Sequence, residues 1–183
     1  KLRQNITQIA ALSVAQLLEV YGLKPSVKWP NDVLVQGKKI SGILCEVVES
    51  NKNVYGILGI GLNVNSMEES LSFVGIPATS LRCELNQKVI RLELLKKLLE
   101  IIINCFNVLC QSGFTQNRLE LKKRLAFINE HIVFTDIKKE SYSGRIIDLN
   151  DDGTLLFECE KRGIISLNSG EIAFNNLYLK RDY

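Results

Sequence analysis

Two lysines and an Asn-Asp pair stand close together near the start of the chain, and together they could bind a polyanion. These four residues are Lys28, Asn31, Asp32 and Lys39. Pro30 breaks the strand that Lys28 ends, and Gly37-Lys38 is typical of a two-residue hairpin turn, so the hairpin returns Lys39 to the same end. Ammonium groups beside an amide and a carboxylate suit phosphates and their metal ion. The alternative is a hairpin with solvated lysines, and the local pattern alone favours that alternative.

A run of glycines is the second candidate for a binding site. Gly56, Gly59 and Gly61 occur in one expected strand and are followed by Asn63. The spacing does not fit G-x-G-x-x-G before a helix, so it does not predict a Rossmann dinucleotide site. Glycines in a strand permit the close approach of a ligand or of another strand, and the sequence leaves both open.

The composition indicates a folded protein whose mild positive charge suits an enzyme with anionic ligands and does not by itself argue for nucleic-acid binding. The 183 residues are 46% hydrophobic and 23% charged, and the net charge of +3 is mild. Five cysteines without a C-x-x-C pair, with His131 as the only histidine, argue against a zinc site and against a disulfide framework. Free thiols fit a reducing cytosol, so we expect a cytoplasmic protein. The longest apolar run, 98–110, is too short and too polar to span a membrane.

The elements that would position these residues begin with a helix and a strand meander. Apolar residues recur every three or four positions over 5–21, which predicts an amphipathic helix that ends at Gly22. Antiparallel strands are expected next, and a long connection, 63–86, has little periodicity. Two further helices are expected after it. The expected strands are 26–29, 32–36, 39–48 and 54–62, and the later helices are 92–110 and 115–125.

The pattern changes after residue 129 to short strands separated by polar turns. Four or five strands in about fifty residues predict a small β-barrel, and 166–172 is interpreted as a turn after the last of them. The fold class is therefore α+β, and we place the boundary near Ala126, which gives domains 1–126 and 127–183. The expected barrel strands are 131–134, 141–149, 154–158 and 162–167.

Three segments in this order resemble the central signature of the biotin protein ligases. They are Lys-Trp-Pro-Asn-Asp (28–32), Gly-Lys-Lys-Ile-Ser-Gly-Ile-Leu-Cys-Glu (37–46) and Gly-Ile-Gly-Leu-Asn-Val-Asn (59–65). The Ser-Gly-Glu-Ile of 169–172 resembles the closing part of that family's C-terminal domain. The resemblance implies a class II synthetase-like mixed or antiparallel sheet with helices, followed by an SH3-like β-barrel. The related lipoate-protein ligases resemble the chain less, because residues 28–30 and 43–46 are flanks of the biotin type.

The resemblance also implies a reaction and assigns residues to it. Members of this family join biotin to ATP, with Mg²⁺ held largely by the phosphates, and transfer biotin to a lysine of a biotin carboxyl carrier protein, an acetyl-CoA carboxylase subunit. Lys39 matches the catalytic lysine, and Lys39 and Gly42 match biotin-binding positions. Trp29 would either pack on adenine or buttress the strand end. The positions that match the nucleotide-binding part are Lys28, Trp29, Asn31, Asp32, Gly59, Gly61, Asn63 and Glu171, and no residue is assigned as a metal ligand.

One family signature has no match, and it defines the alternatives. The Gly-Arg-Gly-Arg-type loop that binds biotin would lie immediately before Lys1, and residues 1–183 alone are expected to bind biotin and ATP weakly or not at all. A lipoate-protein ligase and a ligase-like module without activity are therefore kept as alternatives. No helix-turn-helix is visible, so no DNA-binding domain is expected in this chain. An exposed sheet edge would suit a homodimer.

Overall fold

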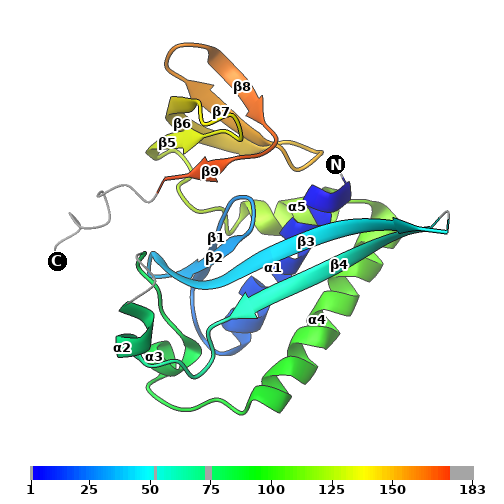
Figure 1. The fold of residues 1–183 in the computed structure, drawn as a ribbon, viewed down its shortest axis with the longest axis vertical. Helices are drawn as coiled ribbons and strands as arrows, with labels where there is room; N and C mark the ends of the chain where they lie inside the picture. Colours follow the sequence, from blue (N-terminus) through cyan, green and yellow to red (C-terminus); the bar gives the residue numbers. More distant parts are fainter. Residues whose placement is uncertain (1, 52, 73–75, 174–183) are drawn as a thin grey trace.

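The computed structural model describes residues 2–51, 53–72 and 76–173, and Figure 1 shows two sheets with helices around the larger one. Residues 174–183, the end of the second expected domain, lie outside the described part. The larger unit carries a four-stranded antiparallel sheet in the order β1-β2-β3-β4. Its elements are α1 (Leu2–Val20), β1 (Pro25–Lys28), β2 (Asp32–Val35), β3 (Lys38–Ser50), β4 (Asn53–Leu62), α2 (Glu68–Leu71), α3 (Leu81–Leu85), α4 (Arg91–Ser112) and α5 (Thr115–Lys122).

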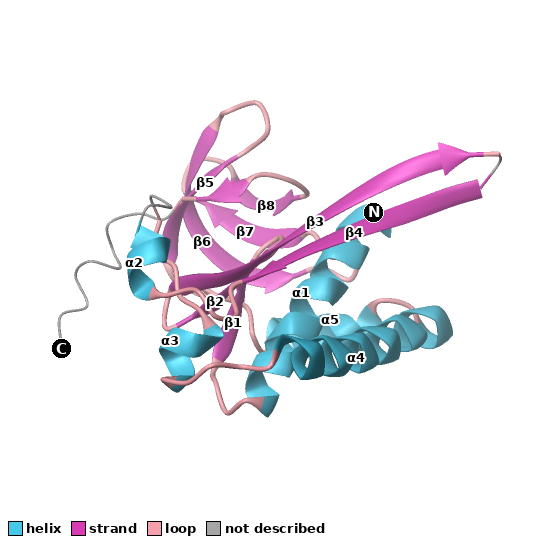
Figure 2. Ribbon diagram, turned by 60° about the horizontal axis from the view of Figure 1, so that its bottom comes forward, coloured by secondary structure: helices cyan, strands magenta, loops and turns pink. Residues whose placement is uncertain are grey.

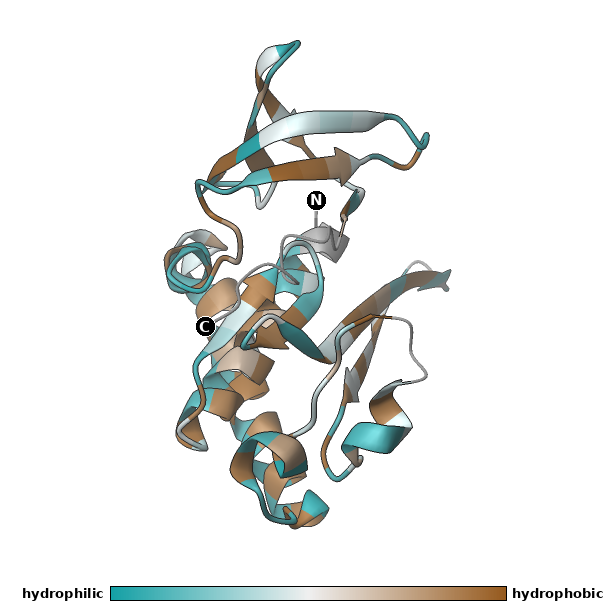
Figure 3. Cartoon of the chain, turned by 90° about the vertical axis from the view of Figure 1, so that its left-hand side faces the viewer, coloured by the Kyte–Doolittle hydropathy of each residue, from teal (hydrophilic) through white to brown (hydrophobic). Residues whose placement is uncertain are grey.

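Helix α1 lies against the sheet and forms the centre of the core. Residues 8–15 are all buried, as are Leu17 and Leu18, so this part of the helix is enclosed on all sides rather than on one face. Hydrophobic residues, brown in Figure 3, occur along the helices and strands, and the turns are mainly hydrophilic. Burial of this kind is the main stabilising contribution to a domain of this size, and it makes α1 a rigid support for the strands in front of it.

The turn between β2 and β3 lies one residue earlier than the sequence predicted. Gln36 and Gly37 both have positive φ, at 50° and 75°, and Lys38 is already paired with Val35. Positive φ at both central positions is the requirement of a type I′ turn, which matches the twist of the flanking strands. The prediction of Gly37-Lys38 as the turn pair was therefore wrong, because it gave the glycine the first of the two positions and not the second.

Strands β3 and β4 form a long hairpin whose far end extends beyond the rest of the molecule (Figure 2). Ten residue pairs join the two strands, from Ser41↔Leu62 to Ser50↔Asn53. Near the tip the side chains are exposed on both strands, and Val54 is 62% exposed. The hairpin therefore packs on the rest of the molecule only in the half nearest β2, where most of its side chains are buried or partly buried.

The connection 63–86 contains two short helices, α2 and α3, that its weak periodicity did not predict. Ser80 is the N-cap of α3, and its hydroxyl accepts a hydrogen bond from the backbone N–H of Cys83. Before α3, the chain runs beside the start of β3: the N–H of Lys39 donates to the carbonyl of Pro77, and the N–H of Thr79 donates to the carbonyl of Lys39. The connection therefore holds the backbone of the predicted catalytic lysine from the side away from β2.

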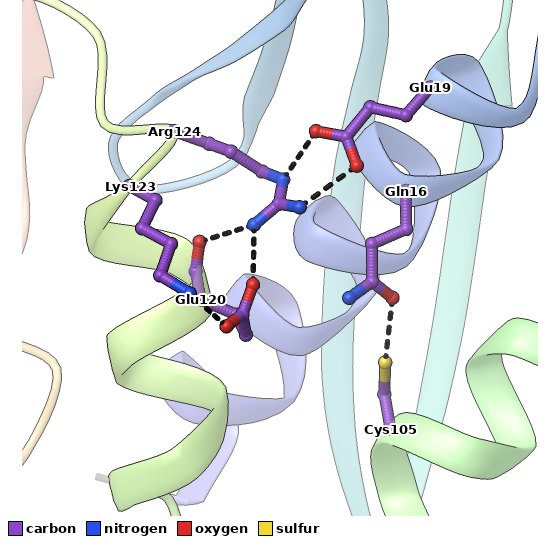
Figure 4. A network of polar contacts seen from close by, with 6 residues as sticks. All are labelled: Gln16, Glu19, Cys105, Glu120, Lys123 and Arg124. Atoms are coloured by element: carbon purple, nitrogen blue, oxygen red, sulfur yellow. Dashed lines mark hydrogen bonds and ion pairs between the residues drawn. The ribbon is translucent and has the colours of Figure 1, made fainter.

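Helix α5 is joined to α1 by a polar network centred on Arg124 (Figure 4). Its guanidinium donates two hydrogen bonds to the carboxylate of Glu19, at 2.7 and 2.8 Å, and further ones to Glu120. Bidentate geometry of this kind makes the pair stronger than an ordinary surface ion pair. Because the carbonyl of Arg124 also accepts from the N–H of Val27, the network helps to fix the edge strand β1.

Stability is expected to depend weakly on pH through Glu120. A hydrogen bond from Lys123, with a second from Arg124, holds the pKa of this carboxyl below its ordinary value of 4.5. A lowered folded pKa gives stability that is fully present above pH 4.5 and is lost as the pH falls through the folded value. We expect Glu120→Gln to lower the free energy of unfolding by about 0.5 kcal/mol at pH 7, because the pair is partly exposed. Urea unfolding at pH 7 and pH 3 should show this difference shrink at the lower pH, whereas the exposed control Glu100→Gln should show none.

The second unit is a five-stranded antiparallel sheet in the order β8-β7-β6-β5-β9. The expected strands are all present, and the stretch interpreted as a turn contributes a fifth, β9, which pairs with β5. This confirms a small sheet domain, and closure into an SH3-like barrel stays a prediction, as does the boundary near Ala126. The strands are β5 (His131–Thr135), β6 (Ser141–Leu149), β7 (Leu155–Cys159), β8 (Gly163–Leu167) and β9 (Glu171–Ile172).

A turn of the small domain docks into the larger unit. The carbonyl of Gly153 accepts hydrogen bonds from Gln8 Nε2 at 2.7 Å and from Trp29 Nε1 at 3.1 Å. Gly153 has φ of +86°, and a Cβ there would lie 2.6 Å from Gln8 Oε1, so glycine is required by both conformation and space. The two units are thus held together beside the end of β1, where the candidate site begins.

Candidate active site

Lys39 and Asp32 form a close ion pair at the junction of β2 and β3. Lys39 Nζ lies 2.6 Å from Asp32 Oδ1, and the side chains are 30% and 11% exposed. The register of the two strands shifts between Val33 and Leu34, so that Leu34 faces Lys39 and Ile40 is the extra residue. A bulge re-aims side chains, and this one buries Ile40 completely while Lys39 turns toward Asp32. The sequence predicted this approach from the hairpin alone.

Gly42 leaves the space that Lys39 needs. It pairs with Asp32 across the strands, and a Cβ on Gly42 would lie 3.1 Å from Lys39 Cε and 3.4 Å from Asp32 Oδ1. Contacts this short require the flexible end of the lysine to move. Glycine at this position therefore leaves the space that the ammonium group of Lys39 occupies beside Asp32.

We expect Gly42→Ala to lower the catalytic rate by about tenfold, because the end of Lys39 must shift by less than the misplacement of about 1 Å that costs about a hundredfold. The folded structure should survive, since the displaced atoms are the end of a partly exposed side chain. Gly56→Ala, on the outer part of β4, is the matched control, because a Cβ there would meet only Ile6 Cδ1 at 3.7 Å. A Gly42→Ala protein with unchanged rate and unchanged melting temperature would contradict this role.

Two further glycines line a shallow hollow of about 500 Å³ beside the ion pair. Gly59 pairs with Leu44, and Gly61 pairs with Gly42, so the neighbouring strands present a nearly bare backbone. Asn31, Asp32 and Lys39 also line this hollow. The arrangement suits a ligand that lies flat on the sheet with an anionic end at Lys39. The third glycine of the run, Gly56, lies outside the lining.

Lys28 is buried directly behind this pair. Its side chain is 3% exposed, and its Nζ lies 3.9 Å from Asp32 Oδ2 and 3.9 Å from Glu171 Oε1. Burial lowers the pKa of Lys28, and the two carboxylates partly oppose that shift. Asp32 thus faces one lysine with each of its oxygens. The structure also brings Glu171, predicted from the distant C-terminal segment, to the same cluster.

Trp29 lies in the core between the two units. Its side chain is 1% exposed, and its ring centroid lies 6.1 Å from that of Phe134. Together with the hydrogen bond to Gly153, this burial favours the buttress over stacking on a nucleotide base, the two roles that the sequence left open. Trp29 therefore positions its neighbours Lys28 and Asn31.

The two asparagines hold backbone segments around the site. Asn31 Nδ2 donates to the carbonyl of Ile43 at 3.0 Å, and Asn63 Nδ2 donates to the carbonyl of Thr79 at 3.0 Å. Asn31 lines the hollow, whereas Asn63 is absent from the linings of the described cavities. A contact of Asn63 with phosphates stays a prediction.

Sequence reasoning missed a larger cavity of about 840 Å³ between the two units. Asn31, Ile43 and Leu44 line it from the larger unit, and Asn168 to Gly170 line it from the small domain. The turn-forming Ser169-Gly170 was noticed only as a motif, because the sequence carries no signal for the packing of one domain against another. The cavity adjoins the hollow at Asn31 and Leu44.

Comparison with known proteins defines the class to which this fold and site belong. Residues 4–63 match the model of the biotin/lipoate A/B protein ligase family, and residues 127–175 match the biotin protein ligase C-terminal domain. The bifunctional ligase/repressor BirA of Bacillus subtilis is 30% identical over 171 residues, 92% of this chain and 52% of the relative. The chain therefore spans about half the length of the curated relatives it matches.

Solved structures agree with the sequence comparison. The biotin protein ligase of Aquifex aeolicus in complex with biotin and ATP matches with a TM-score of 0.79 and 28% identity, over 93% of this chain and 70% of that chain. The apo structure of the same enzyme gives a TM-score of 0.81. Within the biotin/lipoate ligase class, this chain belongs to the biotin protein ligases, with a catalytic-domain part followed by the C-terminal domain of that family. The lipoate-protein ligase alternative is not favoured.

Proposed function

We propose that the polypeptide containing this chain activates biotin with ATP to biotinyl-AMP and transfers the biotinyl group to a lysine of a biotin carboxyl carrier protein. The observation that carries the proposal is the Lys39–Asp32 pair beside the glycine-floored hollow, in a chain of this family. The name of the Aquifex structure gives biotin and ATP as ligands of that relative. A relative from Paracoccus denitrificans, 28% identical, is named biotin--[acetyl-CoA-carboxylase] ligase, which supports the carrier.

In the first step a carboxylate oxygen of biotin attacks the α-phosphorus of ATP, and pyrophosphate leaves. Negative charge gathers on the phosphate oxygens in the transition state, where a fixed ammonium stabilises it more than in the ground state. Lys39 supplies that ammonium. Asp32 holds it in place through the 2.6 Å contact, so little reorganisation is needed when charge develops.

In the second step the carrier lysine amine attacks the biotinyl carbonyl, and AMP leaves with the bonding electron pair. The attacking nitrogen becomes positively charged as the new bond forms, and the carboxylate of Asp32 stabilises this charge and accepts the proton that the nitrogen then loses. Lys39 again faces the oxygens on which charge develops. The same pair thus serves both half-reactions.

The remaining site residues provide space and support. Gly42 leaves room for biotin over the sheet, Gly59 and Gly61 leave room for the nucleotide, and Lys28 and Trp29 support the site from the buried side. Mg²⁺ would accompany the phosphates of ATP, which suits a site with few protein oxygens. Among residues 2–51, 53–72 and 76–173, no group of three His, Cys, Asp or Glu side chains could hold a metal ion.

Location and assembly belong to the same proposal. No helix in the described part of the chain is long and apolar enough to cross a membrane. A cytoplasmic location is proposed from the bacterial relatives of this type, and it fits cysteines outside disulfides such as Cys105 and Cys159. The homodimer stays a prediction.

The test is biotin-dependent exchange of labelled pyrophosphate into ATP, followed by mass spectrometry of an added carrier domain. The protein used is the polypeptide encoded by the complete reading frame that contains residues 1–183. Exchange with biotin, no exchange with lipoate, and a biotinyl mass increment on one carrier lysine are expected. Exchange with lipoate alone, or no exchange with either acid from a folded protein that binds ATP, would reject the proposal.

A further inference from the structure

The end of β1 holds a buried ammonium group between carboxylates from both domains. Lys28 Nζ lies 3.9 Å from Asp32 in β2 and 3.9 Å from Glu171 in β9, which are 139 residues apart in the chain. An ammonium that is 3% exposed requires charged or polar partners, because an unpaired buried charge is strongly destabilising. The side chain is therefore held in one place by both domains.

The backbone of Glu171 is fixed by strand pairing, although its side chain is 78% exposed. Its backbone pairs with Thr135 in β5, and the neighbouring Ile172 is 1% exposed. A Cβ on the preceding Gly170 would lie 2.3 Å from the ring of Phe134, the ring that packs on Trp29. The backbone position of Glu171, and therefore the reach of its carboxylate toward Lys28, is set by the packing between the small domain and β1.

Asp32 connects this buried contact to the site. Its Oδ2 faces Lys28, and its Oδ1 faces Lys39. Because both lysines face the same carboxylate, a displacement of Lys28 is expected to change how Asp32 holds the ammonium group of Lys39. Lys28 was assigned from the sequence to the nucleotide. It lines a cavity of about 290 Å³ with Asp32, Lys39 and Glu171, but only 3% of its side chain is exposed, so most of it is in contact with protein.

We propose that Lys28 is a positioning residue that couples strand β9 of the small domain to Lys39 through Asp32. The inference rests on the proposed function, because the effect of Lys28 is measured as a change in the rate of that reaction. It assigns Lys28 and Glu171 to one unit that sets the geometry of the Lys39–Asp32 pair, rather than to two separate contacts with ATP. The small domain then acts on the catalytic rate without touching the reacting atoms.

The kinetic test compares Lys28→Met, Glu171→Gln and the double variant with the exposed control Lys38→Met. Lys28→Met should lower kcat of pyrophosphate exchange by at least tenfold, with KM for ATP changed less than threefold. Glu171→Gln should lower kcat by a smaller factor, and the double variant should be no slower than Lys28→Met alone. Losses that multiply in the double variant, or a raised KM for ATP with unchanged kcat, would overturn the proposal.

A second measurement keeps the coupling testable without activity. Hydrogen–deuterium exchange is followed in the amides of Asp32 to Ile43 and of Thr135 and Ile172, in wild type and in Glu171→Gln. This variant changes an exposed side chain and is expected to fold. Faster exchange in the Asp32–Ile43 hairpin of the variant is expected, and exchange confined to β5 and β9 would overturn the coupling. If the wild-type protein showed no biotin-dependent pyrophosphate exchange, the proposed function would be rejected. The hydrogen–deuterium exchange result would still report on the coupling between β9 and the hairpin.

Discussion

Lys39→Ala is expected to lower the rate of biotin-dependent pyrophosphate exchange by about a hundredfold to a thousandfold, the range for loss of one preorganised donor to a developing oxyanion. Lys39 lines the hollow, where its ammonium group can stabilise the charge that develops on the phosphate and carboxyl oxygens. The variant should remain folded, because the Lys39 side chain is 30% exposed and Lys28 still faces the carboxylate of Asp32 after Lys39 is removed. The measurements are exchange kinetics and thermal unfolding.

The matched control is Lys38→Ala, one residue earlier on the same strand. Lys38 is exposed and pairs with Val35 at the hairpin turn, so its loss removes the same charge without touching Asp32. If the two alanine variants reduced exchange equally, the effect would be one of net charge near the site. An exchange rate within twofold of wild type in a folded Lys39→Ala protein would contradict the role of Lys39.

The part of the site that depends on one hairpin could be predicted from the sequence. Lys39, Asp32 and Gly42 lie within eleven residues, and strand pairing brings them together whatever surrounds them. The turn residues were misplaced by one, yet the bulge after Val33 still left Lys39 beside Asp32. Local pairing rules therefore suffice for this pair but not for its register.

The parts that depend on packing between domains could not be predicted. Whether Lys28 faces solvent or Glu171 is decided by where β9 docks. Trp29 is buried against a turn of the small domain, where the carbonyl of Gly153, 124 residues later, accepts its hydrogen bond. Helices α2 and α3 were missed for a different reason: at four and five residues they are too short for a helical pattern of apolar residues to be recognised in the sequence. The resemblance to the family assigned Glu171 to the nucleotide-binding part of the site, whereas the local sequence pattern of 166–172 predicted only a turn.

Trp29→Ala is expected to lower the free energy of unfolding by about 3–5 kcal/mol, the range for truncation of a large buried aromatic side chain. The indole is 1% exposed, packs on Phe134 across the domain junction, and donates to the carbonyl of Gly153. Its removal leaves a cavity where β1, the small domain and α1 meet. Urea unfolding monitored by circular dichroism measures the loss, and a change below 1 kcal/mol would contradict the buttress role.

Trp29→Phe separates the two roles that the sequence left open for this residue. Phenylalanine keeps most of the packing and removes the indole N–H, and the Gly153 carbonyl still accepts from Gln8, so the expected loss of stability is about 1 kcal/mol. KM for ATP should change less than twofold, because the ring faces the core and not the hollow. A ring that stacks on adenine would behave in the opposite way, since the smaller aromatic face would raise KM for ATP while the folded state kept its stability. The pair of measurements on this variant therefore decides whether the conspicuous Lys-Trp-Pro-Asn-Asp segment contacts the nucleotide through its tryptophan or holds the strand end that presents Asp32 to Lys39.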